Sequence, residues 1–138
     1  MRVTSLFVLT AGLGLVFATV AAIPVSAHHS FAAEFDSSLP VNITGTVTKL
    51  EWANPHARVY VDVKDETGKV INWDFELGSP NGLMRRGWTR NSLKFGDVVT
   101  VVGTRAKNAP HVGNARTFTL ADGKKVFAGS SQDEPQQN

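Results

Sequence analysis

The fold is decided by the stretch Arg58-Val59-Tyr60-Val61-Asp62-Val63, in which apolar and polar residues alternate without a break. This period of two is typical of a half-buried β-strand with its valines on the core side. A hairpin turn is predicted at Lys64–Lys69, and the other strand of the hairpin at Val70–Leu77. In that strand we expect two sets of side chains, one facing the core (Ile71, Trp73, Phe75, Leu77) and one facing out (Asn72, Asp74, Glu76).

The segments on either side of the hairpin complete the pattern. Before it, Val41–Leu50 alternates and is rich in β-branched residues, and Gly45 within it favours a bend. After it, Ser79 and Pro80 are typical of a helix start, and Gly87 of a helix end. Further strands are predicted at Val98–Gly103 and Ala115–Leu120, with a short return at Lys125–Phe127.

Three strands, one short helix and two strands come in the order of an OB-fold. We therefore predict an all-β fold with one short helix, arranged as a five-stranded OB-like Greek-key barrel. Trp88, which follows the helix, is expected to plug the core. An open β-sandwich or another small barrel is the alternative fold.

Residues 1–27 have the features of a cleaved secretory signal peptide. Met1-Arg2 is a short positive start, an uncharged apolar run extends from Leu6 to Val25, and Ser26-Ala27 precedes the expected cleavage site. The alternative is an uncleaved transmembrane anchor, since the run approaches the roughly 20 residues that span a bilayer. We favour cleavage, because glycines and threonines dilute the run. A periplasmic or secreted protein with no stable membrane anchor is therefore expected.

Cleavage after residue 27 leaves 111 of the 138 residues, enough for one domain with a modest core. We expect an N-terminal arm over residues 28–40, the OB-like domain over 41–128 and a disordered tail over 129–138. Phe31 and Phe35 are four residues apart, so one helical turn would place both rings on one side. Such a turn would dock the arm on the domain.

The composition of the mature chain excludes several kinds of function. Loss of Arg2 leaves 13 Lys and Arg residues against 12 Asp and Glu residues. Because the charge is then nearly balanced, we expect no nucleic-acid partner. The chain has no cysteine, which excludes disulfides, thiolate ligands and a thiol nucleophile.

The four histidines, His28, His29, His56 and His111, are the sharpest chemical feature of the sequence. Cleavage would make His28 the first residue, and its α-amine and ring could then chelate one metal ion. A nitrogen from His56 would complete a T-shaped set, which suits Cu(II). His29, adjacent to His28, is a further candidate ligand. His111 is another, since the loops of His56 and His111 flank the usual OB-fold binding face. The competing interpretation is a solvated His-His pair and a His56 ring hydrogen-bonded within its turn.

A second hypothesis involves no metal. Trp52, Asn54 and Tyr60, with His56, would form a ligand face for a small molecule or an envelope protein partner. A copper-dependent redox enzyme is a third possibility, but no catalytic residues are predicted. Asp62, Asp74 and Glu76 are expected to share one outer face with Arg58 and Tyr60. A carboxylate pair there could do acid–base work, but we interpret these residues as cross-strand charge pairs on a solvated face.

Four short motifs carry a resemblance to a known family: His28–Phe31 (HHSF), Asn54–His56 (NPH), Asn72–Glu76 (NWDFE) and Arg86–Trp88 (RGW). Together they resemble a family of short exported bacterial proteins of unknown function, over nearly all of the mature chain. The resemblance implies a small periplasmic protein. It implies no activity, so no catalytic or metal-binding residue is taken from it.

Overall fold

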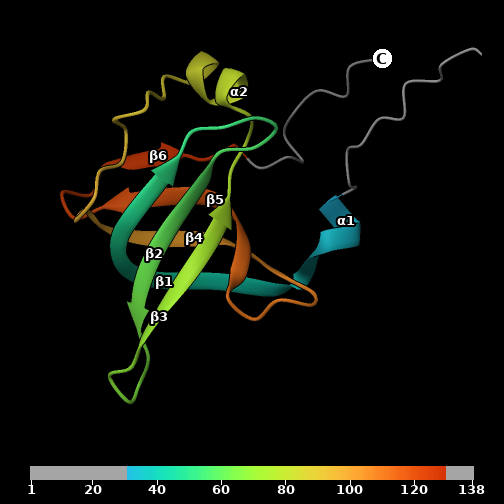
Figure 1. Cartoon of the computed structure of the whole chain (residues 1–138), viewed down its shortest axis with the longest axis vertical. Coiled ribbons are helices and arrows are strands. Elements are labelled where there is room, and N and C mark those ends of the chain that lie inside the picture. The colour runs from blue at the N-terminus through green and yellow to red at the C-terminus, as the bar shows by residue number, and fades with distance from the viewer. Residues whose placement is uncertain (1–30, 130–138) are drawn as a thin grey trace, which may run out of the picture.

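Five strands close into a ring in the computed structural model, which describes residues 31–129. The strands are β1 (Phe35–Glu51), β2 (Arg58–Lys64), β3 (Val70–Glu76), β4 (Val98–Ala106), β5 (Val112–Leu120) and β6 (Lys125–Phe127); the helices are α1 (Phe31–Glu34) and α2 (Pro80–Arg85). The strand order is β3-β2-β1-β4-β5-β6, and β3 also pairs with β5 (Figure 1). That last pairing is parallel and closes the ring, while the others are antiparallel. The predicted OB-like fold is confirmed, with a second short helix, α1, added to it.

The long strand β1 joins the two halves of the ring. Its first part pairs with β4 and its last part pairs with β2, and the strand curves round between the two, as Figure 1 shows. Gly45 lies in this curve, where a β-carbon would clash with the backbone oxygen of Asp62. The pairing with β2 shifts register between Val47 and Lys49. The glycine and the bulge together allow the curvature that closure requires.

The prediction that the first strand begins at Val41 was wrong, because β1 begins at Phe35. Part of the expected arm therefore belongs to the sheet. Phe35 pairs with Ala106 of β4, is 2% exposed and packs its ring 5.1 Å from that of Phe31, measured between centroids. This confirms the expected helical turn. Pairing with β4 outweighs the weak strand propensity of the intervening serines and proline.

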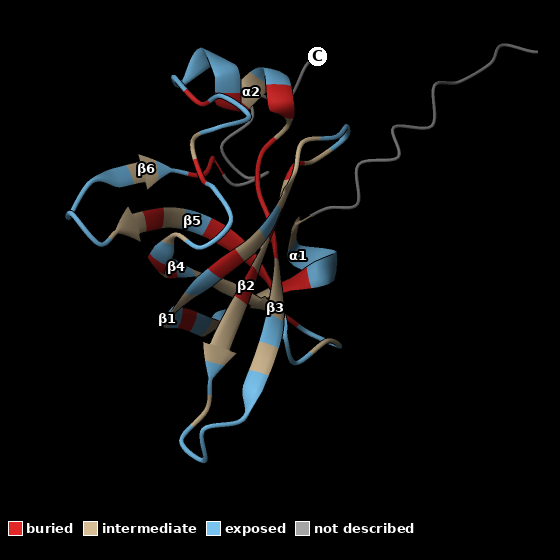
Figure 2. Cartoon of the chain, turned by 60° about the vertical axis from the view of Figure 1, so that its left-hand side comes forward, coloured by how far each residue is buried: buried red, intermediate tan, exposed pale blue. Residues whose placement is uncertain are grey.

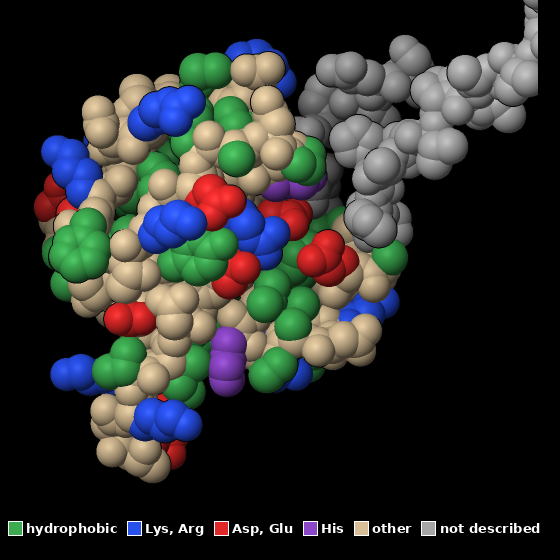
Figure 3. Space-filling view, in the orientation of Figure 1, with side chains coloured by type: hydrophobic (Ala, Val, Ile, Leu, Met, Phe, Trp, Pro, Cys, Tyr) green, Lys and Arg blue, Asp and Glu red, His purple; other side chains and the backbone are tan. Residues whose placement is uncertain are grey.

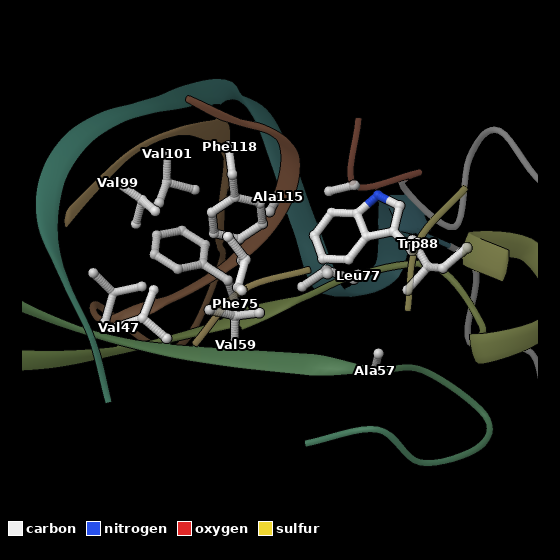
Figure 4. Packing of buried hydrophobic residues seen from close by; sticks show 14 of the residues in the cluster. Val47, Ala57, Val59, Phe75, Leu77, Trp88, Val99, Val101, Ala115 and Phe118 are labelled. Atoms are coloured by element: carbon white, nitrogen blue, oxygen red, sulfur yellow. The ribbon is translucent and has the colours of Figure 1, made fainter. Parts of the chain in front are cut away.

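The hydrophobic core is built from residues of all five strands of the ring, and Figure 2 shows buried residues along these strands. The rings of Phe75 and Phe118 meet edge to face at 6.4 Å, and those of Trp88 and Phe118 at 6.2 Å. Figure 4 shows valines of β1, β2 and β4 around the two phenyl rings, with Trp88 and Leu77 at the other end of the cluster. Trp88 is 3% exposed, so its predicted place in the core is confirmed.

The start of α2 also follows the sequence. The side-chain oxygen of Ser79 accepts a hydrogen bond from the backbone N–H of Gly82 at 3.1 Å, which makes Ser79 the N-cap. Gly87, after the helix, has a φ of +86°, a conformation that glycine adopts without strain.

One prediction about β3 was wrong. Glu76 was expected to face solvent, but its residue is only 8% exposed. Alternation does place its side chain on the outer face of the ring. Parallel pairing with β5 sets Asn114 opposite Glu76, and Asn114 is itself 2% exposed. The outer face is therefore covered at this end of β3, which the local sequence pattern cannot reveal.

Candidate functional site

A charged cluster lies on the outer face of β2 and β3, and its members are held in register by the antiparallel ladder. Arg58 lies opposite Glu76, and Tyr60 lies opposite Asp74. The Nε of Arg58 donates to a carboxylate oxygen of Asp74 at 2.8 Å, and its Nη1 lies 3.6 Å from a carboxylate oxygen of Glu76. The expected cross-strand charge pairs are therefore present, with one guanidinium shared between two carboxylates.

Glu76 is the buried member of this cluster. Burial raises the pKa of its carboxyl above the ordinary value of 4.5, and the charges of Glu34 and Asp74 raise it further. His56 and Arg58 act in the opposite direction and favour the ionised form. Glu76 thus lies within electrostatic reach of both α1, through Glu34, and the loop that carries His56.

His56 has one ring nitrogen fixed by the backbone. Its Nδ1 lies 3.1 Å from the carbonyl oxygen of Leu77. A carbonyl oxygen only accepts hydrogen bonds, so Nδ1 carries the proton of this bond. In the neutral ring the lone pair is then on Nε2, which is the arrangement usual for histidines that bind metal ions.

His111 lies beside the middle of β3. Its ring packs 5.5 Å from that of Trp73, and its backbone oxygen accepts from the N–H of Asp74 at 3.0 Å. His56 is bonded to Leu77, four residues further along, a separation of about 13 Å in an extended strand. Figure 3 accordingly shows two separate histidine patches, with charged side chains between them. The structure does not bring these two predicted ligands together.

The described part of the chain does not contain a complete metal site. Among residues 31–129, no three His, Cys, Asp or Glu side chains gather in a way that could hold a metal ion. The predicted ligands His28 and His29 lie outside the described residues. The predicted signal peptide also lies outside the described residues. Within residues 31–129, no helix has the length and apolar character needed to cross a membrane.

The three residues predicted to form a ligand face are not gathered in one place. Trp52 is half-buried and packs against the core cluster. Tyr60 lies on the outer face, where its hydroxyl donates to Glu51 at 3.5 Å and the Lys49 ammonium lies 5.2 Å from its ring centre. Asn54 is exposed in the loop after β1. The barrel wall therefore separates Trp52 from Tyr60.

A pocket of about 600 Å³ lies between α1 and the outer face of the ring. The residues that line it come from α1, β2, the end of β4, the following loop and β5: Ala33, Glu34, Arg58, Ala106, Asn108, Ala109 and Val112. Sequence reasoning named none of these as site residues. The seven lining residues share no sequence pattern. They come together only because α1 packs on the ring and β3 pairs with β5.

The site can now be set beside known proteins. A family model described as "Family of unknown function (DUF6152)" matches residues 16–115. The chain belongs to this family. The family of unknown function expected from the four motifs is thus confirmed. No curated protein and no solved structure matches the chain.

The DUF6152 match covers all four histidines and the charged cluster of β2 and β3. It begins inside the predicted signal peptide and ends within β5, so β6 lies beyond it. Since the family description names no activity, function has to be argued from the site.

Proposed function

We propose that this DUF6152 protein is an exported binding module that holds one Cu(II) ion at its processed N-terminus. The ligands are the α-amine and ring of His28 and the Nε2 of His56, with His29 as the alternative to either ring. Three nitrogen donors in a T-shaped arrangement suit Cu(II) best among common divalent ions. His111 lies too far along β3 to take part.

The observation that carries this proposal is the hydrogen bond between His56 Nδ1 and the Leu77 carbonyl oxygen. Such a bond fixes the tautomer and the direction of the ring before any metal ion arrives, which raises affinity. The bond leaves Nε2 as the metal-binding atom.

The place of α1 supports the reach of the N-terminus. α1 begins at Phe31, three residues after His28, so the two Cα atoms lie within about 11 Å of each other. Glu34 of α1 and His56 both act on the pKa of Glu76, so α1 and the His56 loop approach one buried side chain. The carboxylates of Glu34, Asp74 and Glu76 also favour a cation in this region.

The experiment is a Cu(II) titration of the exported protein, after mass spectrometry has established its first residue. We expect one tightly bound ion and a Cu(II) spectrum of nitrogen ligation. Adding one alanine before His28, or changing His56→Ala, should weaken binding by at least about 100-fold, since each change removes a ligand. His111→Ala is the matched control and should bind as the wild type does. Equal affinity in all of these proteins would reject the proposal.

A second candidate function is binding of a small molecule without metal. It is favoured by the pocket beside α1, whose volume lies within the range of about 300 to 1,000 Å³ usual for small-molecule sites. Metal-free protein that binds a small molecule would support it. Pocket-filling substitutions such as Ala109→Trp would then abolish that binding and leave copper affinity unchanged.

A further inference from the structure

The pocket between α1 and the ring, here called the α1 pocket, is defined by the seven lining residues given above. Its walls combine two chemistries. Ala33, Ala106, Ala109 and Val112 supply small apolar surfaces, while Glu34, Arg58 and Asn108 supply a carboxylate, a guanidinium and an amide. Such a mixture suits a small ligand that has a compact carbon frame and several polar groups.

Among the described residues that line the α1 pocket, Glu34 and Arg58 carry opposite charges, but the charge of Arg58 is shared with two carboxylates outside the lining. Arg58, the one cation among these lining residues, already contacts both Asp74 and Glu76. Glu34 forms no ion pair with any residue of the described range 31–129, and its side chain is exposed to the pocket. A ligand that places a positive group beside Glu34 is therefore favoured electrostatically.

The other cations near Glu34 form no ion pair with its carboxylate within residues 31–129. The ammonium of Lys107 donates a hydrogen bond to the backbone oxygen of Ala32. Lys107 and Arg105 both act on Asp36, whose pKa is lowered first by hydrogen bonds from Ser38 and then by these two charges.

A buried donor lies behind the pocket wall. Asn114 is two residues after the lining Val112, so both side chains lie on the same face of β5. Asn114 is 2% exposed, and its Nδ2 has no hydrogen-bond partner within residues 31–129. A buried donor without an acceptor is costly, so an oxygen atom at this position would be stabilising.

We propose that the α1 pocket binds a small hydroxylated primary amine, of the class represented by a hexosamine. Its ammonium lies beside Glu34, one of its hydroxyl oxygens accepts from the amide of Asn108, and its carbon frame packs on the alanines. This inference rests on the second candidate function, small-molecule binding, and does not depend on copper.

The test is isothermal titration of the full exported protein, kept free of metal with a chelator, using glucosamine, glucose and glucuronate as probes. The three share a ring and differ in charge. We expect glucosamine to bind at least about tenfold more tightly than glucose, and glucuronate to bind more weakly than glucose. Tighter binding of glucuronate would overturn the ligand class while leaving small-molecule binding in place. No binding of any probe would overturn the inference.

Variants locate the binding. Glu34→Gln should remove the preference for glucosamine over glucose, since only the charge is lost. Glu66→Gln, the same change in the exposed β2–β3 turn, is the matched control and should leave the preference intact. Ala109→Trp should abolish binding of glucosamine, with thermal unfolding measured to confirm that the variant is folded. A Glu34→Gln protein that keeps the wild-type preference would contradict the proposed contact.

Discussion

Gly113 of β5 lies directly opposite Phe75 of β3 at the parallel pairing that closes the ring. There is no room between them for a methyl group, because a β-carbon on Gly113 would lie 2.8 Å from Cε1 of the Phe75 ring. The close approach of these two strands therefore depends on a residue without a side chain. The same parallel pairing sets Asn114 opposite Glu76.

This contact gives the first stability prediction. Gly113→Ala should lower the free energy of unfolding by about 1–3 kcal/mol, the usual cost of overpacking a core. The measurement is urea unfolding followed by tryptophan fluorescence. The double variant Gly113→Ala with Phe75→Leu should lose less stability than the sum of the losses of the two single variants. The reason is that the smaller leucine side chain leaves space for the added methyl group. Additive losses would show that the ring and the glycine are not coupled.

The second prediction concerns Trp88, whose indole N–H donates to the backbone oxygen of Phe127 at 2.7 Å. This bond ties β6 to the segment after α2. Trp88→Phe removes the hydrogen-bond donor and part of the contact with Phe118. The free energy of unfolding should therefore fall by about 1–3 kcal/mol. Phe95→Leu, at a side chain 83% exposed, is the control and should change stability by less than about 0.5 kcal/mol. Equal stability of both variants would contradict the structural role of the bond.

The third prediction is a pH dependence that comes from Glu76. Its pKa in the folded protein is raised above the ordinary value of 4.5 by burial, so the native state binds this proton more tightly than the unfolded chain does. The stability linked to that proton is fully present below pH 4.5 and is lost as the pH rises through the folded pKa. In Glu76→Gln the side chain has no carboxyl proton to lose as the pH rises. The variant should therefore gain stability relative to the wild type as the pH rises from acidic to neutral.

Chemical unfolding of both proteins across that range measures this difference. Glu66→Gln, the same change at an exposed residue of the β2–β3 turn, is the control with which the Glu76→Gln difference is compared. A flat difference for Glu76→Gln would mean that the buried carboxyl titrates as an ordinary one.

Much of the barrel was predictable because its strands follow local rules. The alternation in β2 and β3 gave the inner faces of both strands, since a strand with one buried face has a period of two. Ser79, Pro80 and Gly87 marked α2, because the ends of a helix need particular side chains and backbone angles. Trp88 was placed in the core from its position after that helix. The four motifs also indicated the family that the matched model confirms.

The sequence was less informative where two distant strands define each other. β1 starts at Phe35 because β4 continues to Ala106 beside it, and neither extension has a strong local signal. The wrong prediction for Glu76 has the same origin. The histidines were visible at once, yet their spacing could not show that His56 lies beside Leu77, after the end of β3, and His111 beside Trp73 in its middle.

The strands of the hairpin, the capped helix and the adjacent histidines His28 and His29 were thus determined by the sequence itself, since each depends on residues close together in the chain. The tertiary structure alone decided the closure between β3 and β5, the burial of Glu76 and Asn114, and the pocket beside α1. These features arise from contacts between segments dozens of residues apart, and no local periodicity encodes which segments will meet.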